Sequence, residues 1–204
     1  MNDFIIDGVA SVNGGEFGKI SIDGVGKCSG NIKAETVEID GIFTCDGSIA
    51  AQRIKCDGKA EVYSNIKAKE LNVDGMLRVM GSEGKIEADE ITCDGYISAD
   101  MEINADKIVV NGHLRAREIV GDSVSIKTSA SKLSRFIRRK FSEIDAIEAT
   151  EIVLAGVIAS NVSGENISIG PLCEVENLEC SGTLFIDEDA NVNNISGDYT
   201  MSNG

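Results

Sequence analysis

The sequence predicts an all-β fold, a parallel β-helix or solenoid of about ten or eleven coils, and three observations support this prediction. A motif of one apolar residue, one aspartate or asparagine and one glycine recurs seven times. Asp23, Asp40, Asp57 and Asp74 follow one another at intervals of 17 residues. Apolar and polar residues alternate between the motifs, as they do on strands with one buried face. A repeat of this length with strand-like alternation is typical of one turn of a β-helix.

Apolar residues form columns that predict the strands. Two columns precede the glycines, and a third lies further along each repeat and ends in alanine. Side chains at alternate positions point to the same side of a strand, so we expect these columns to line the core. The columns are Ile20, Val37, Ile54, Leu71, Ile91 and Ile108; Ile22, Ile39, Cys56, Val73, Cys93 and Val110; and Ile32, Ile49, Ile66, Ile86 and Ile103.

The spacing between columns predicts the corners of each coil. Three residues, instead of two, separate Ala34 from Val37 and Ala51 from Ile54, which marks one corner. The glycine after each aspartate predicts a second corner, at a bend that needs a positive φ or a close approach of two backbones. We expect the aspartates to bond to their own backbone at this turn. Calcium held between stacked carboxylates is the alternative.

The chain is expected to be one domain with an interruption. Residues 1–126 form the first part of the β-helix, residues 127–146 a basic amphipathic insertion, and residues 147–204 the second part. At 100° per residue, the apolar and basic residues of 127–142 separate onto opposite faces of a short helix. This helix is expected either to contact an anionic membrane or a partner, or to pack on its own rod. The contact residues are Lys132, Leu133, Arg135, Phe136, Ile137, Arg138, Arg139 and Phe141.

Composition narrows the function classes. The net charge of −15 disfavours binding to nucleic acid phosphates. Aromatic residues make up 4% of the chain and Trp is absent, so the core is expected to be thin and aliphatic. No apolar run approaches the roughly 18 residues of a membrane span, and the N-terminus lacks the basic region of a signal peptide. The expected compartment is the cytoplasm.

Candidate catalytic and metal sites are weak. Cys28, Cys45, Cys56 and Cys93 occupy inward columns, where a thiol packs as a small apolar group; disulfides or a metal are the alternatives. His113 is the only histidine, so neither a histidine-based triad nor a multi-histidine zinc site can be built. No phosphate-binding loop is present. We therefore expect no catalytic, cofactor or metal site, no cofactor and no small-molecule substrate; the protein is not expected to be an enzyme.

The repeats resemble those of the bactofilins, a family of polymer-forming bacterial cytoskeletal proteins. The resemblance rests on the recurring frame that ends in Asp-Gly and on its continuations Gly30-Asn31-Ile32-Lys33-Ala34 and Gly47-Ser48-Ile49-Ala50-Ala51. It implies a right-handed parallel β-helix that polymerises end to end without nucleotide and supports envelope, cell-shape or motility organisation. It also implies frequent membrane association, at the inner face of the cell membrane. The implied partners are further copies of the chain, the anionic inner membrane surface or another bactofilin-like protein.

The two ends of the rod are the predicted polymerisation surfaces. An open β-helix end exposes unpaired backbone groups above an apolar lumen, and no capping helix is evident at either end. A tail at Ser196–Gly204 that folds over the lumen is the alternative for one end, and an acidic monomeric adaptor or binding module is the alternative function. The residues expected at the joints are Phe4, Ile5, Ile6, Leu184, Phe185 and Ile186.

An outward column directly after the glycines is unusually apolar. Either it serves as a lateral contact or a seat for the basic helix, or bent corners tuck its side chains partly inward. Its apolar members are Val9, Val25, Ile42, Met76 and Tyr96.

Overall fold

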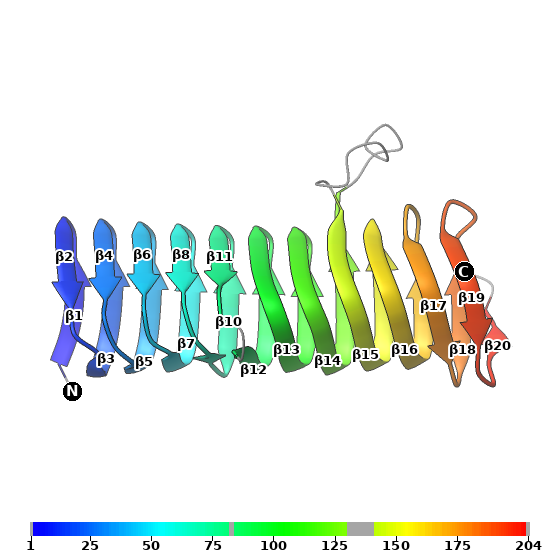
Figure 1. Cartoon of the computed structure of the whole chain (residues 1–204), viewed down its shortest axis with the longest axis horizontal. Coiled ribbons are helices and arrows are strands. Elements are labelled where there is room, and N and C mark those ends of the chain that lie inside the picture. Colours follow the sequence, from blue (N-terminus) through cyan, green and yellow to red (C-terminus); the bar gives the residue numbers. More distant parts are fainter. Residues whose placement is uncertain (1, 82–83, 130–140, 203–204) are drawn as a thin grey trace.

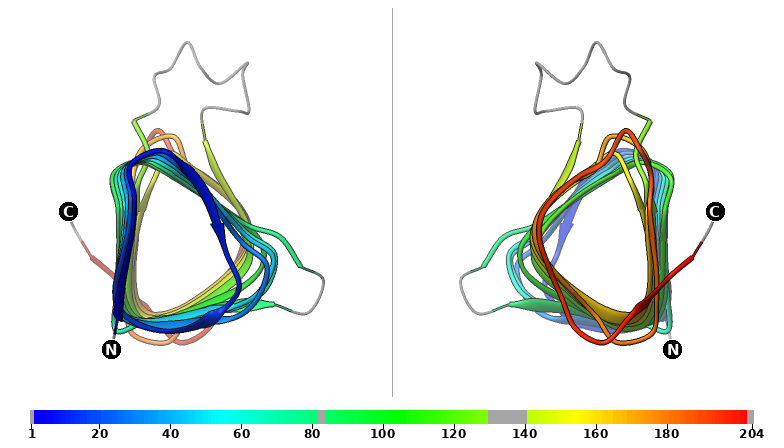
Figure 2. Two further views of the ribbon diagram at one scale, coloured as in Figure 1. Left: turned by 90° about the vertical axis from the view of Figure 1, so that its left-hand side faces the viewer. Right: turned by 90° about the vertical axis from the view of Figure 1, so that its right-hand side faces the viewer.

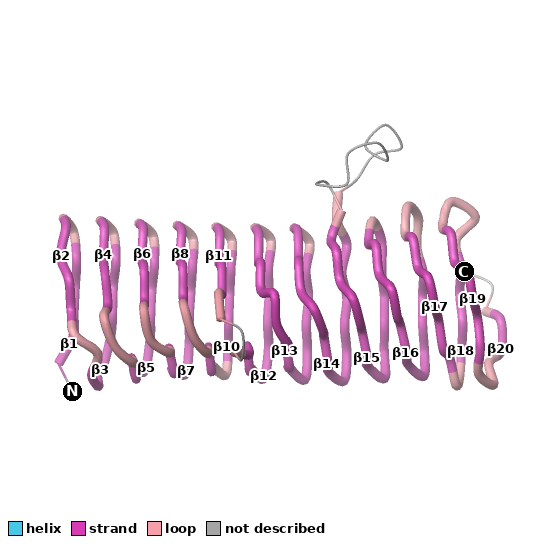
Figure 3. Tube along the Cα trace, in the orientation of Figure 1, coloured by secondary structure: helices cyan, strands magenta, loops and turns pink. Residues whose placement is uncertain are grey.

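The computed structural model describes residues 2–81, 84–129 and 141–202, and in these residues the chain is a straight rod of stacked strands (Figure 1). Figure 3 shows strands and loops, without a helix in the described part. In chain order the strands are β1 (Asn2–Ile6), β2 (Val9–Val12), β3 (Gly15–Ile22), β4 (Val25–Cys28), β5 (Ile32–Ile39), β6 (Ile42–Cys45), β7 (Ile49–Cys56), β8 (Lys59–Val62), β9 (Ile66–Lys67), β10 (Glu70–Val73), β11 (Met76–Val79), β12 (Lys85–Cys93), β13 (Tyr96–Val110), β14 (His113–Lys127), β15 (Ser142–Ala155), β16 (Val157–Ile169), β17 (Glu174–Cys180), β18 (Thr183–Ile186), β19 (Asn191–Ser196) and β20 (Thr200–Met201).

The strands form a parallel β-helix of about eleven coils, which confirms the predicted fold. Each coil has three faces and a triangular outline (Figure 2). Face 1 begins with β1, face 2 with β2 and face 3 with the first residues of β3. A strand on one face pairs with the strands of the same face in the coils before and after it, as β5 does with β3 and β7. The termini therefore lie at opposite ends of the rod (Figure 1).

The register follows the predicted columns. On face 1 Ile22 lies opposite Ile39, and Ile39 lies opposite Cys56. All three side chains are almost fully buried, because alternate residues of each strand point into the lumen. The core is mostly aliphatic. Its most deeply buried aromatic side chain is that of Phe43, which is 1% exposed and lies between Gly26 and Ala60 of the neighbouring coils. The small neighbours leave room for this large ring.

Close backbone approach, not a positive φ, explains the glycines of the Asp-Gly corner. A Cβ on Gly58 would lie 2.1 Å from the carbonyl oxygen of Gly41, one coil closer to the N-terminus. Gly24, Gly41 and the later members of this column are equally tight, and the positive φ values belong to other glycines, Gly156 and Gly197. Gly8 differs, because no atom lies within 4 Å of its Cβ position. Gly8 belongs to the first described coil, so no described coil lies against its Cβ position.

The interruption of the rod is shorter than the sequence indicated. Face 2 resumes at Ser142, where β15 begins, five residues before the expected boundary at 147. The sequence pattern did not predict this start, because the first inward position of the strand carries a serine where the pattern expects an apolar residue. The Oγ of buried Ser142 lies 2.6 Å from Thr128 Oγ1 and accepts a bond of 3.0 Å from the Leu114 N–H. The two hydroxyl groups thus form a hydrogen bond with each other in the core, and this bond joins the two ends of the interruption.

Candidate assembly surfaces

The N-terminal end of the rod presents open strand edges. Among the described strands, β1 pairs only with β3 and β2 only with β4, so the other edge of each faces outward along the axis. Phe4 points into the lumen and contacts Phe17, with ring centroids 5.9 Å apart and ring planes tilted by 47°. Val12 is half-buried against the same core, and Ala10 is exposed although it heads an inward column. The lumen therefore opens at this end with an apolar mouth.

The C-terminal end is built from β19 and β20. β19 pairs with β17 and leaves its other edge open among the described strands. Ile195 and Met201 are 41% and 57% exposed, and Val192 is half-buried against the core. β20 pairs with β18 on face 1, where Thr200 lies opposite Thr183 and Met201 opposite Leu184. The described part of the tail at 196–204 therefore extends the coil and does not fold across the lumen.

The structure places the six predicted joint residues in three kinds of position. Phe4 and Ile6 lie in the first coil and point inward. Leu184 and Ile186 also point inward, but β20 covers Leu184, which is 0% exposed and lies one coil from the end. Ile5 and Phe185 lie on the outer surface of face 1: Ile5 is 62% exposed, and Phe185 lies opposite Ser168. A strict alternation along each strand produces this division.

The six predicted joint residues leave out others that form the outermost coils. They are Ala10, Val12 and Phe17 at one end, and Val192, Ile195 and Met201 at the other. The columns of the interior coils lead directly to them: Val175 of an interior coil lies opposite Val192. At the C-terminal end the segment 191–202 is rich in Asn, Ser and Thr, which weakens the apolar alternation there.

The contact residues predicted at Lys132, Leu133, Arg135, Phe136, Ile137, Arg138 and Arg139, and the helix that would carry them, lie outside the described residues. Phe141 is described and is 6% exposed. The outward apolar column is present in register: Val9, Val25 and Ile42 are 85%, 44% and 48% exposed, whereas Met76 and Tyr96 are half-buried. Only the three N-terminal members thus form an exposed apolar line.

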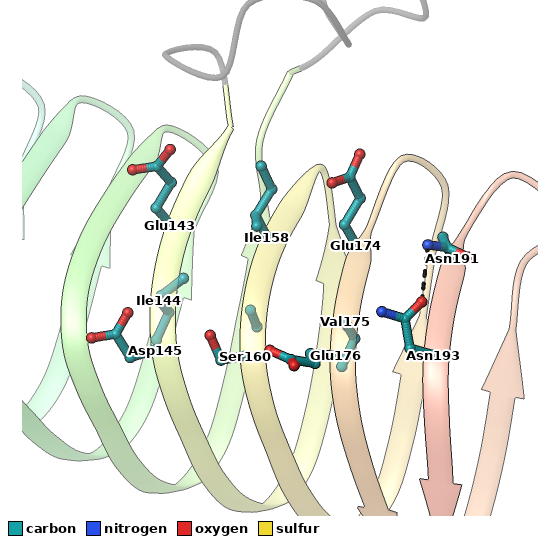
Figure 4. A pocket seen from close by; sticks show the side chains of 11 residues that line it. Glu143, Ile144, Asp145, Ile158, Ser160, Glu174, Val175, Glu176, Asn191 and Asn193 are labelled. Atoms are coloured by element: carbon teal, nitrogen blue, oxygen red, sulfur yellow. Dashed lines mark hydrogen bonds between the residues drawn. The ribbon is translucent and has the colours of Figure 1, made fainter.

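Charge is distributed unevenly along the rod. In the N-terminal coils, lysines and arginines pair with carboxylates of neighbouring coils, as Arg53 does with Glu70 at 2.8 Å and Lys107 with Glu90 at 2.7 Å. Residues 141–204 contain 12 acidic residues and no lysine, arginine or histidine. Figure 4 shows part of this acidic region, a shallow depression on face 2 with Glu143, Asp145, Glu174 and Glu176 along it. The C-terminal third of the rod is therefore uniformly acidic.

The cysteines pack in the core as predicted. All six are buried with free thiols, and Cys28 lies opposite Cys45 on adjacent coils. Burial raises the pKa of the Cys45, Cys56 and Cys93 thiols to about 12 and that of Cys173 to about 11. A thiol with such a pKa stays protonated at neutral pH and is a poor nucleophile.

Two aspartates of the Asp-Gly corners make hydrogen bonds other than the predicted ones. Asp57 Oδ2 accepts a bond of 2.6 Å from Lys55 Nζ, and Asp94 Oδ1 accepts one of 2.9 Å from Asn111 Nδ2, where a bond to the residue's own backbone was expected. The backbone of the corner bonds between coils instead: the N–H groups of Asp57 and Gly58 both donate to the Ile39 carbonyl. Within the described residues, no group of three or more His, Cys, Asp or Glu side chains is arranged to hold a metal ion.

Comparison with known proteins gives a match for the N-terminal coils. A family model described as bactofilin, polymer-forming cytoskeletal, matches residues 1–82. Residues 1–82 are therefore similar to the bactofilin family. Neither the curated proteins nor the solved structures gave a match. Because bactofilins are a structural cytoskeletal family and not an enzyme family, the match supports a cytoskeletal scaffold.

The bactofilin match covers the coils with the most regular Asp-Gly repeat. The later coils keep the same three faces, as the pairing of β15 with β16 along all of them shows. In the described part of the chain, no helix is both long and apolar enough to cross a membrane.

Proposed function

We propose that this protein self-assembles end to end, without nucleotide, into polymers that scaffold envelope, cell-shape or motility organisation in the bacterial cytoplasm. The observation that carries the proposal is the N-terminal end, where two open strand edges surround an apolar lumen. Soluble β-solenoids commonly cover such an end with a helix or a charged loop. A second copy would pair the free backbone groups and cover the exposed mouth of the lumen.

Electrostatics sets a condition on this assembly. Each copy carries a net charge of −15, so two copies repel each other as they approach. Repulsion between exposed charges decays over about 8 Å at physiological ionic strength and over about 30 Å at 0.01 M salt. The proposed polymer is therefore expected to form more readily as salt is raised, because the apolar and backbone contacts of the joint are short-ranged.

We further propose that the basic segment at 132–140 attaches the polymer to the anionic inner face of the membrane. The support is its sequence: five basic residues without an acidic one, in an otherwise acidic chain. Each lysine or arginine near such a surface contributes about 1 kcal/mol. Many copies on one polymer would add their weak attractions and hold it on the membrane.

An acidic monomeric adaptor is the second candidate function. The uninterrupted acidity of residues 141–204 favours it, because such a surface suits a basic partner. The adaptor and the scaffold differ in self-association: an adaptor remains monomeric at all salt concentrations, whereas a scaffold forms rods longer than one chain.

Ala10 and Ser11 provide a matched pair for testing end-to-end assembly. Both are exposed on β2, but Ala10 heads an inward column at the open end, whereas Ser11 heads an outward one. Ala10→Arg would place a charge in the mouth of the lumen and should abolish assembly, and Ser11→Arg should assemble as the wild type does. Sedimentation and negative-stain electron microscopy without nucleotide, with circular dichroism as a folding check, measure the outcome. A wild type that stays monomeric over 0.01–0.5 M salt would refute the proposal and favour the adaptor.

A further inference from the structure

Face 2 carries two outward rows of side chains that run along the rod. They lie on β11, β13, β14, β15, β16 and β17, which pair in that order on this face. The first row contains Arg78, Ser98, Arg115, Glu143, Ile158 and Glu174. The second row lies two residues further along each strand and contains Met80, Asp100, Arg117, Asp145, Ser160 and Glu176. Figure 4 shows both rows on β15, β16 and β17.

The charges of these rows divide at the boundary between β14 and β15. On the N-terminal side, β11 and β14 contribute three arginines to the rows, and Asp100 of β13 is the one acidic residue there. On the C-terminal side, β15 and β17 contribute four carboxylates, and β16 contributes only uncharged residues. One half of the surface is therefore mainly basic, and the other half is acidic.

Most of these charges have no ion pair within the rod. Arg78 pairs with Glu61 at 3.8 Å. Among the residues that the structure describes, neither Arg115 nor Arg117 belongs to an ion pair, and the four carboxylates belong to none either. Both of these arginines are exposed. Exposed, unpaired charges of both signs on one face suit a partner surface with the opposite arrangement of charge.

The acidic half is also hollowed. Its shallow depression is lined by the four carboxylates together with Ile158 (Figure 4). Arginine suits such a hollow, because its methylene stem packs on apolar surface while its guanidinium group binds carboxylates with two parallel hydrogen bonds. The basic half of the same face supplies arginines, so a second copy of this chain has the required chemistry.

A two-fold axis that crosses the rod between β14 and β15 brings the two halves together. The second rod then runs antiparallel to the first, and each row faces the same row of the other copy. β14 faces β15, β13 faces β16 and β11 faces β17, so the pairs across the contact are Arg115 with Glu143, Arg117 with Asp145 and Arg78 with Glu174. Parallel rods in register would instead place arginines near arginines and carboxylates near carboxylates, which is unfavourable.

We propose that face 2, from β11 to β17, binds the same face of a second copy in an antiparallel pair of rods. The two-fold symmetry produces each arginine–carboxylate contact twice. The contact goes beyond the proposed function, because it uses the side of the rod and leaves both ends free. Where copies also assemble end to end, many such contacts would act together and join polymers side by side.

A single contact of this kind is expected to be weak. Six strands span about 29 Å along the rod and five residues span about 16 Å across it, so each copy would bury about 460 Å². Standard interfaces bury about 800 Å² on each partner. The pair is therefore expected at high protein concentration. At physiological ionic strength the screening length of about 8 Å exceeds the length of an ion pair, so the attraction across the contact persists.

Charge reversal tests the contact by sedimentation velocity at about 0.15 M salt. All proteins carry Ala10→Arg, so that assembly at the N-terminal end does not contribute, and this protein is the parent. Arg115→Glu with Arg117→Glu places like charges opposite each other and should weaken the pair about tenfold or more. Lys33→Glu with Lys67→Glu makes the same change in net charge on face 3 and should pair as the parent does.

An equal mixture of two variants separates a contact between copies from ion pairs within one chain. The second variant carries Glu143→Arg with Asp145→Arg and should also pair poorly alone. In the mixture, each reversed arginine position faces a reversed carboxylate position, so mixed pairs should form with the affinity of the parent. Pairs in both single variants, or no pairs in the mixture, would overturn the proposal. A parent that stays monomeric at its highest soluble concentration would overturn it too, while end-to-end assembly is judged separately on the wild type.

Cross-linking tests the antiparallel arrangement. Ser98 of β13 and Ile158 of β16 are expected opposite each other, so Ser98→Cys and Ile158→Cys proteins are treated with a short bifunctional thiol reagent, separately and as an equal mixture. The native thiols are buried, and the parent gives the background. The proposed contact predicts covalent dimers mainly in the mixture. Dimers mainly from Ser98→Cys alone would indicate parallel rods, and dimers from none of the samples would place the two residues apart; either result contradicts the proposal.

Discussion

Gly58→Ala and Gly8→Ala make the same change at the same position of the repeat, yet we expect opposite results. A Cβ on Gly58 would lie 2.1 Å from the Gly41 carbonyl oxygen and 2.4 Å from that of Asp40. Side-chain Cβ atoms essentially never approach within 3.0 Å, so the two coils must separate by about 1 Å at this corner. At Gly8 the same methyl group meets nothing within 4 Å.

The size of the effect follows from the bonds that this separation stretches. The N–H groups of Asp57 and Gly58 donate to the Ile39 carbonyl at 2.9 and 2.8 Å, and the Lys59 N–H donates to the Gly41 carbonyl at 2.8 Å. Each such bond contributes about 0.5–1.5 kcal/mol, so the loss of all three should cost about 1.5–4.5 kcal/mol. For a chain of this length that corresponds to a fall in melting temperature of about 3–18 °C. Gly8→Ala should leave the melting temperature unchanged or raise it slightly, because alanine lowers the entropy of the unfolded chain.

Thermal unfolding followed by circular dichroism measures this difference. Both changes are made in the Ala10→Arg background, so that assembly at the N-terminal end does not influence the comparison. The same protein concentration and heating rate are used throughout, because solenoids can unfold in more than one step. Equal melting temperatures for the two variants would refute the close approach of coils as the reason for the corner glycines.

Two further predictions concern thiols and charge. Burial raises the pKa of the Cys45 thiol to about 12, so the native protein should react slowly with thiol reagents at pH 8 and rapidly in urea. Fast labelling of the native protein would contradict this. The thiol's contribution to stability is present below about pH 9 and is lost as pH rises towards 12. The double change Arg138→Glu and Arg139→Glu should release assembled protein from anionic liposomes at low salt, whereas Lys33→Glu with Lys67→Glu, an equal change in charge on the rod, should not. Wild-type protein that ignores these liposomes would rule out the membrane role of the basic segment.

The sequence by itself determined the coil and its register. The constant spacing of the Asp-Gly corners, together with strict alternation, places Ile39 between Ile22 and Cys56 without reference to coordinates. The inward position of the cysteines follows from the same columns. This worked because each interior coil has the same environment as its neighbours, so the same pattern is repeated many times.

Only the tertiary structure decided how the repeat starts, stops and resumes. In the sequence Ser142 is typical of a loop residue, and only the structure shows that its hydroxyl group points inward and bonds to that of Thr128. Gly8 and Gly58 occupy the same position of the sequence repeat, yet only Gly58 has the backbone of a preceding coil against its Cβ position. Leu184 and Phe185 appear equally terminal, but β20 covers the first while the second points outward. The physical reason is common to all of these cases: a residue's role at an end depends on which neighbouring strand is present or absent, and the repeat pattern does not contain that information.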